Sequence, residues 1–273
     1  MRLTYFGKNV IMYNTIIGEL YMTETILYIF SILLKVGIIP TAVLIYKKKI
    51  KFINGLFVGT FLFLASFGCQ VYSANIMYGY SMIDNVVNAV FDEMKSVYSS
   101  SQGLTAEDAA MIGQAIDAVK DVYFAILPTI LVCTNLVWVY ILLMVSKGIF
   151  ALCKRDVSGF MKFCDFRMSK FGVLMGAAAY IISVLSGDGR LSYAFLNFTM
   201  ILLFAAAVCG LSAIDFKFRR VLKSSIVRFV IYFIAVFLTV LAMGIGFGLL
   251  VFWGIYDAFF NIREPRNRLP KQE

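Results

Sequence analysis

The last apolar stretch of the chain carries three polar side chains within seven residues, Asp257, Asn261 and Arg263. Asp257 and Asn261 are one helical turn apart, so they share a helix face. A carboxylate inside a bilayer is a candidate functional group, because burying a charge there is costly. The alternative is that Asp257 lies at headgroup depth and pairs with Arg263 to end the helix. The elements that position these residues decide between the two interpretations.

The composition predicts a polytopic membrane protein. The 273 residues are 61% hydrophobic and 15% charged, whereas a soluble domain has about 45–50% apolar and about 25% charged residues. The net charge of +9 comes from short basic clusters between apolar stretches, which is typical of cytoplasmic loops. We therefore expect the bilayer of the cell membrane as partner and no nucleic acid.

The residues of enzymatic chemistry do not occur in recognisable patterns. Histidine is absent, and the five cysteines show no close paired spacing of the kind that binds zinc. No phosphate-binding loop, dinucleotide motif or nucleophile with a paired base is recognisable. The sequence therefore predicts no enzyme, no metal site and no cofactor.

Apolar stretches predict an all-α transmembrane helical bundle of about six to seven spans, forming one integral membrane domain over residues 1–273. A segment at 10–20 is a poor span and a fair interfacial helix. The lysines at 47–51 mark the cytoplasmic side by the positive-inside rule. The same rule places the carboxyl-terminal tail, residues 264–273, in the cytoplasm. The expected spans are 25–46, 54–75, 122–145, 171–185 and 191–214, with one or two more in 229–256.

Residues 78–121 predict an extracellular insertion of two amphipathic helices. Apolar residues recur there with a period near 3.6, and polar residues occupy the other faces. Thr105, followed by Glu107 and Asp108, is an expected N-cap for the second helix. The acidity of the segment favours an outside location.

Three further segments have specific expectations. The basic loop at 147–170 contains Phe160, Phe163 and Phe166, which predict a short helix in the membrane interface or a docking face for a protein partner. The stretch 229–256 is too long for one span and too short for two. Basic residues on both sides of it favour a hairpin that breaks near Gly244–Gly248, with one long tilted helix as the alternative. Small-residue pairs, Gly172 with Gly176 and Ala206 with Gly210, predict close helix approach.

Intramembrane polar side chains are the remaining candidates for a site. Gln70, Asn135 and Asn197 should lie in the outer half or middle of their spans and could line one ligand cavity. Each of them alone fits a helix-packing hydrogen bond better than a ligand contact. Asp215 and Asp257 belong to the inner boundary, where Arg219, Arg220 and Arg263 can neutralise them. Asp257 then acts as a latch that pins the last helix to the bundle.

Several short motifs resemble the YybS-like family of bacterial membrane proteins. They are Gly37-Ile-Ile-Pro-Thr41 before the lysines, Leu127-Pro128, Asn197, Gly210-Leu-Ser-Ala-Ile214 and Gly254–Arg263. That family is similar in architecture to the S components of energy-coupling-factor transporters. The resemblance implies a bundle of six or more spans with an outward-facing cavity, and hence a protein that binds or transports a small solute. The alternative is a non-transporting scaffold that recruits a protein partner in envelope or sporulation processes.

Overall fold

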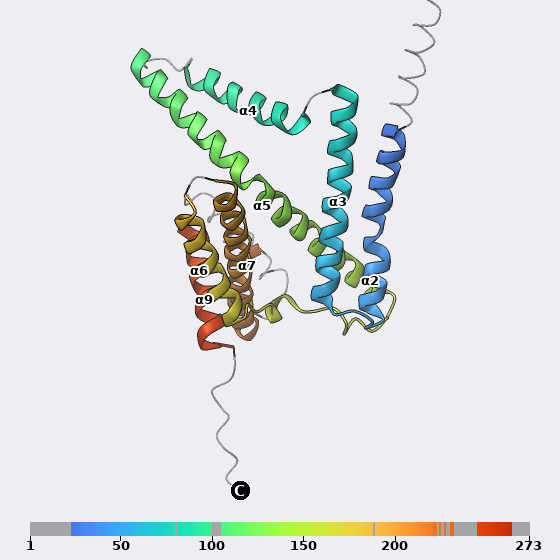
Figure 1. The fold of residues 1–273 in the computed structure, drawn as a ribbon. Coiled ribbons are helices and arrows are strands. Elements are labelled where there is room, and N and C mark those ends of the chain that lie inside the picture. The colour runs from blue at the N-terminus through green and yellow to red at the C-terminus, as the bar shows by residue number, and fades with distance from the viewer. Residues whose placement is uncertain are drawn as a thin grey trace, which may run out of the picture. The chain divides into compact units, whose positions relative to one another are not determined.

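The computed structural model describes residues 23–79, 81–99, 105–187, 189–222, 224, 227, 230–231 and 245–263. These residues are mainly helical and include no β-strand, so the predicted all-α fold is confirmed (Figure 1). Among the described residues, four helices are long and apolar enough to cross a membrane: Thr23–Tyr46, Phe52–Tyr78, Glu107–Leu152 and Arg190–Arg219. Lys170–Leu185 and Ile245–Phe260 are shorter apolar helices. The expectations for residues 10–20 and for the tail 264–273 lie outside the described residues.

The chain divides into two compact units, the first comprising Met1–Leu127 with Thr134–Gly159 and the second Pro128–Cys133 with Phe160–Glu273. In the first unit the helix Thr23–Tyr46 is interrupted by a turn at Gly37, and its last part is α2, Ile38–Tyr46. Pro40 lies just beyond this turn and has no N–H to donate to the carbonyl four residues before it. The missing donor of Pro40 is thus consistent with the turn at Gly37.

Helices α2, α3 (Phe52–Tyr78) and α5 (Ala106–Leu152) contact one another near the lysine turn. Gly55 lets the Ile45 side chain approach α3, and Gly59 does the same for Val139 of α5. Ile45 and Val139 are both fully buried. The rings of Tyr46 and Phe150 stack with centroids 4.8 Å apart. Close packing at the glycines thus holds the end of the first unit together.

The amphipathic segment forms a helical hairpin of α4 (Met82–Ser99) and the first part of α5. Val87 and Phe91 pack against Ile116, and Lys95 pairs with Asp117 at 2.5 Å. The second helix does not end before the next span, as the sequence suggested, but continues through Pro128 as one helix of 47 residues. Such a helix is about 70 Å long, more than twice the length of about 30 Å that one crossing of the hydrocarbon core requires.

The expected N-cap of this long helix is present. The Thr105 hydroxyl accepts from the Asp108 amide at 3.2 Å, and the Asp108 carboxylate accepts from the Thr105 amide at 3.1 Å. The two residues thereby satisfy each other's free backbone donors in a capping box. Hydrogen bonds from the Thr105 side chain and backbone also lower the pKa of the Asp108 carboxyl.

The second unit is built from α6 (Lys170–Leu185), α7 (Arg190–Val221) and α9 (Ile245–Phe260), with a 3-10 turn, η1, at Phe163–Asp165. Helices α6 and α7 form an antiparallel hairpin. Hydroxyl hydrogen bonds between Ser183 and Ser192 tie the two helices together near their turn. Gly187, with φ of 63°, supplies the left-handed conformation expected for a glycine in a tight turn.

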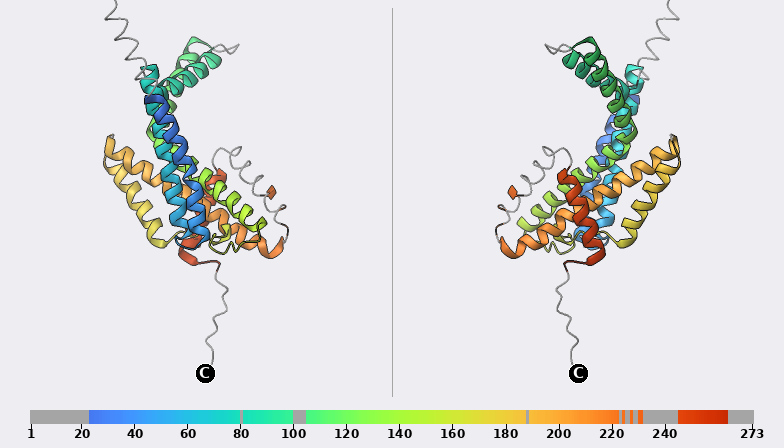
Figure 2. Two further views of the ribbon diagram at one scale, coloured as in Figure 1. Left: turned by 90° about the vertical axis from the view of Figure 1, so that its right-hand side faces the viewer. Right: turned by 90° about the vertical axis from the view of Figure 1, so that its left-hand side faces the viewer.

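Helices α7 and α9 cross in backbone contact at Gly210 and Gly254. A Cβ atom at Gly210 would overlap the Leu250 carbonyl, and one at Gly254 would overlap the Ala206 carbonyl. The predicted pair Ala206 and Gly210 is thus a packing surface for α9. Beyond the crossing both helices descend toward the same end of the unit (Figure 2). The hairpin expected across 229–256 requires α9 to run in the same direction as α7, as it does. Most of the residues that would form its first half, before Ile245, lie outside the described part of the chain.

Candidate functional site

A buried network around Arg263 joins the loop, α7 and α9 of the second unit. The guanidinium donates through Nη1 to the Cys164 carbonyl at 2.5 Å and to Ser212 Oγ at 2.9 Å. Through Nη2 it donates to the Cys209 carbonyl at 2.9 Å and to Asp257 Oδ2 at 2.8 Å. The side chains of Arg263 and Asp257 are 1% and 3% exposed. The ion pair expected from the sequence is therefore present, and it is buried.

The end of α9 explains how Arg263 reaches this position. Asn261 adopts φ of 48°, a left-handed conformation that asparagine tolerates better than most residues. Its amide donates to the Asp257 carbonyl at 2.9 Å, which closes the last turn of the helix. The chain then reverses, and Arg263 folds back beside Asp257.

The basic loop packs against α7 and α9. The Ser212 hydroxyl donates to the Phe163 carbonyl at 2.6 Å and lies 3.1 Å from that of Phe166. Arg167 donates to the Asn261 side chain at 2.7 Å, and Phe160 is buried. The only helical turn in this loop is the 3-10 helix η1, whose carbonyls and those of its neighbours bind α7 and Arg263; its place in the membrane interface stays a prediction. Burial also raises the pKa of the Cys164 thiol.

Asp215 lies near this network but has its own cation. It is almost fully buried and accepts from Arg219 Nε at 2.8 Å, one helical turn along α7. The Lys217 ammonium lies 4.7 Å from the centre of the Trp253 ring of α9. Asp257 Oδ1, Arg263 Nε and Trp253 Nε1 are buried without a hydrogen-bond partner in the described part of the chain. Charged and aromatic groups thus gather at one end of the unit, as at a membrane–water interface.

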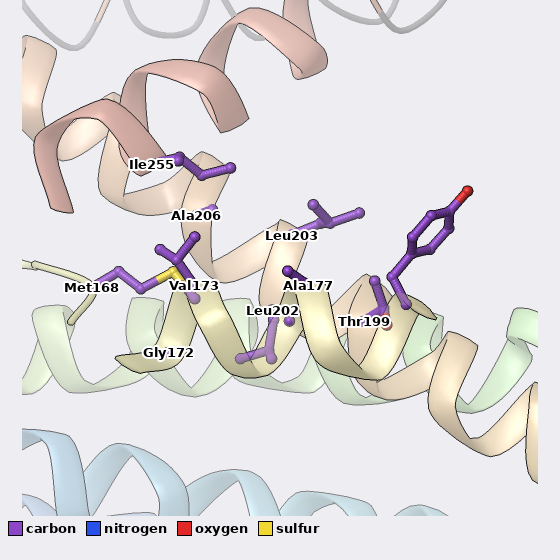
Figure 3. A pocket seen from close by; sticks show the side chains of 11 residues that line it. Met168, Gly172, Val173, Ala177, Thr199, Leu202, Leu203, Ala206 and Ile255 are labelled. Carbon is purple, nitrogen blue, oxygen red and sulfur yellow. The ribbon is translucent and has the colours of Figure 1, made fainter. Parts of the chain in front are cut away.

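An apolar groove of about 350 Å³ lies beside this network, mainly between α6 and α7 (Figure 3). Gly172, Gly176 and Ala177 of α6 give it space because they have little or no side chain. Thr199 and Tyr180 contribute its two side-chain hydroxyls, and that of Thr199 donates to the Phe195 carbonyl at 2.8 Å. The other lining residues are Met168, Val173, Leu202, Leu203, Ala206 and Ile255. The volume is at the lower end of the range of about 300–1,000 Å³ for ligand pockets.

Asn197, the first of the predicted ligand residues, does not line this groove. Its Oδ1 accepts from the Thr129 hydroxyl at 2.6 Å and from the Thr129 amide at 3.2 Å, and its Nδ2 donates to the Tyr193 carbonyl at 2.8 Å. The Thr129 hydroxyl is also 3.0 Å from the Asn197 carbonyl. The side-chain amide of Asn197 thus links α7 to Thr129 within the second unit.

Gln70 and Asn135 belong to the first unit. Gln70 Nε2 donates to Ser31 Oγ at 3.3 Å, and Ser66 Oγ donates to the Ser31 carbonyl at 2.9 Å. Asn135 lies half-buried on α5. The shared ligand cavity of Gln70, Asn135 and Asn197 stays a prediction. Of the groove residues, the sequence had singled out only Gly172, Gly176 and Ala206, and these for helix packing.

A salt bridge outside the spans organises the basic end of the first unit. Lys48 Nζ lies 3.0 Å from Asp156 Oδ2, and Lys48 adopts φ of 57° in its turn. Hydrogen bonds from the Ser158 hydroxyl and amide, together with Lys48, lower the pKa of Asp156 to about 2. The lysine turn and the segment after α5 are thereby joined.

Comparisons with known proteins identify the chain at the level of a family. No group of three or more potential metal ligands occurs among the described residues. Neither a curated protein nor a solved structure matches the chain. Residues 9–250 match the model of one family, described as "Predicted membrane protein (DUF2232)". The match covers most of the chain, so the chain belongs to this family of predicted membrane proteins.

Proposed function

We propose that the protein is a non-enzymatic, multi-pass membrane protein that binds a small apolar or amphiphilic molecule in the groove of its second unit. This proposal keeps the solute-binding class suggested by the resemblance to YybS-like proteins and S components. It replaces the polar ligand residues with an apolar site. Whether binding serves transport depends on movements that a binding site alone does not specify.

The apolar lining of the groove carries the proposal. A polar solute would leave most of its hydrogen-bonding groups unpaired there, which costs free energy. Besides the Tyr180 hydroxyl, the lining offers only the Thr199 hydroxyl, and this already donates to the Phe195 carbonyl. An apolar solute needs no such partners, and small residues at Gly172 and Gly176 leave room for it. The groove therefore selects against vitamins with many polar groups and for hydrocarbon-rich molecules.

A thermal-shift screen in lipid nanodiscs tests this proposal with a matched pair of variants. Ala177 lines the groove and Ala178 does not, although both are exposed on α6. A ligand at about 100 times its Kd stabilises a protein by about 2.7 kcal/mol, and Ala177→Leu should remove that stabilisation. Ala178→Leu should retain it. If no apolar molecule stabilises the protein, or if stabilisation survives Ala177→Leu, the groove is not a binding site.

Partner recruitment is a second candidate, favoured by the α4–α5 hairpin of the first unit. Val86, Val90 and Val97 are 52–59% exposed along one side of α4. An apolar stripe on a segment beyond the bilayer can bind a partner helix. Crosslinking from a photoreactive residue at position 90 tests this role, because a scaffold should give one discrete partner and a hairpin lying on lipid should give none.

A further inference from the structure

The groove of the second unit has a basic end and an apolar end, and this polarity indicates the class of ligand. At the basic end, Met168 and Gly172 line the groove on either side of Lys170, which is exposed at the first position of α6. Arg167, next to Met168, is also exposed and uses one nitrogen to hold Asn261. The first turn of α6 contains no acidic residue, so neither cation is neutralised from there.

The length of the groove matches one leaflet of a bilayer. Its lining on α6 runs from Gly172 to Tyr180, eight residue steps that cover about 12 Å of helix. One leaflet is half of the hydrocarbon core, or about 15 Å. A single acyl chain that enters beside Met168 would therefore follow α6 across most of its leaflet.

We propose that the groove holds one acyl chain of an anionic phospholipid, whose phosphate binds Lys170 and Arg167. This inference rests on the proposed function, because it names the molecule that occupies the same groove. A lipid without net charge fills the groove equally well but gains no net attraction from the two cations. Cations close to a membrane surface favour anionic headgroups, so the headgroup supplies selectivity and the chain supplies most of the buried area.

The network around Arg263 holds the segment that carries Arg167 and Lys170, the two cations proposed to bind the phosphate. Arg167 is bonded to Asn261, which ends α9, and the loop before Lys170 is tied to Ser212 and Arg263. The groove residue Ile255 lies on α9 two residues before Asp257. The same contacts that hold the loop on the bundle therefore fix the backbone of Arg167 and Lys170, the immediate sequence neighbours of the groove residue Met168 and of the segment that begins at Gly172.

Native mass spectrometry of the full chain tests this inference with three lipids that have identical acyl chains. Phosphatidylglycerol is anionic, phosphatidylcholine is zwitterionic and diacylglycerol has no phosphate. We expect one tightly retained phosphatidylglycerol per chain, bound about 25-fold more tightly than either other lipid, since each of the two cations near an anionic headgroup contributes a factor of about five. Lys170→Gln should reduce this preference about fivefold, and Ala177→Leu should weaken all three lipids.

One matched control, read together with Ala177→Leu, separates the possible failures. Lys162→Gln removes the same charge from the same loop at an exposed residue outside the groove, and it should leave the preference unchanged. Equal reduction by Lys162→Gln and Lys170→Gln would show diffuse attraction and overturn the inference. Equal binding of all three lipids, lost in Ala177→Leu, would overturn the phospholipid assignment and leave the proposed function standing. Lipid binding that ignores Ala177→Leu would overturn both.

Discussion

Replacing Arg263 by glutamine should destabilise the second unit, because this one side chain joins three of its segments: the loop before α6, α7 and α9. The guanidinium makes four contacts of 2.5–2.9 Å, to Cys164, Cys209, Ser212 and Asp257. Glutamine cannot reach all of them and leaves the Asp257 charge buried without a cation. Removing one partner of a buried ion pair costs about 3–5 kcal/mol. At about 2–4 °C per kcal/mol for a chain of roughly this size, the Tm should fall by roughly 10 °C.

The assay is thermal unfolding of the detergent-solubilised protein, followed by tryptophan fluorescence. Arg167→Gln is the matched control, because it removes the same charge and one exposed hydrogen bond to Asn261. Its cost should be within about 1 kcal/mol. Combining Arg263→Met with Asp257→Leu should recover much of the loss, because it removes both charges and leaves neither unpaired. Equal melting of Arg263→Gln and Arg167→Gln would refute the buried network as a source of stability.

Three further predictions concern the packing, the pH response and the topology. Gly254→Ala forces a Cβ onto the Ala206 carbonyl and should destabilise the α7–α9 crossing by about 1–3 kcal/mol in the same unfolding assay, whereas Gly248→Ala enters open space and should be neutral or slightly stabilising. The Asp156 pKa of about 2 lies below its ordinary value of about 3.9, so the Lys48–Asp156 turn is fully stabilised above about pH 4. As the pH falls toward 2, the Ser158 amide should lose its protection from hydrogen exchange. Unchanged protection over that interval would contradict the assignment. Cysteines introduced at Gln114 and at Lys49 should differ in intact cells, with only position 114 reacting with an impermeant maleimide, and labelling at position 49 would reverse the predicted orientation.

The sequence predicted the elements of this protein well, because each rests on a local pattern. The apolar stretches marked the spans, the 3.6-residue period marked the α4–α5 hairpin, and the Thr105 box marked the start of a helix. The acid and the guanidinium close together at 257 and 263 were sufficient to suggest their pairing. Local patterns did not predict that α5 continues unbroken from the hairpin into the span.

The candidate site was less predictable, because its decisive contacts are between distant residues or involve backbone atoms. Arg263 binds the carbonyls of Cys164 and Cys209, and every residue type has a carbonyl. Asn197 was singled out for its polarity, but its partner is Thr129, 68 residues away. The groove gave a sequence signal only as small residues on α6, which also fit simple helix packing.

The occupancy of the groove is tested most directly by photolabelling the protein in a bilayer that contains a phospholipid with a diazirine at mid-chain. The account predicts that peptide mapping finds the label concentrated on Gly172–Tyr180 of α6 and on the facing residues 199–206 of α7. Ala177→Leu should remove this label, and Ala178→Leu should not. Label spread evenly over these helices and over exposed apolar side chains elsewhere, such as Phe57 and Phe61 of α3, would contradict the proposed binding function.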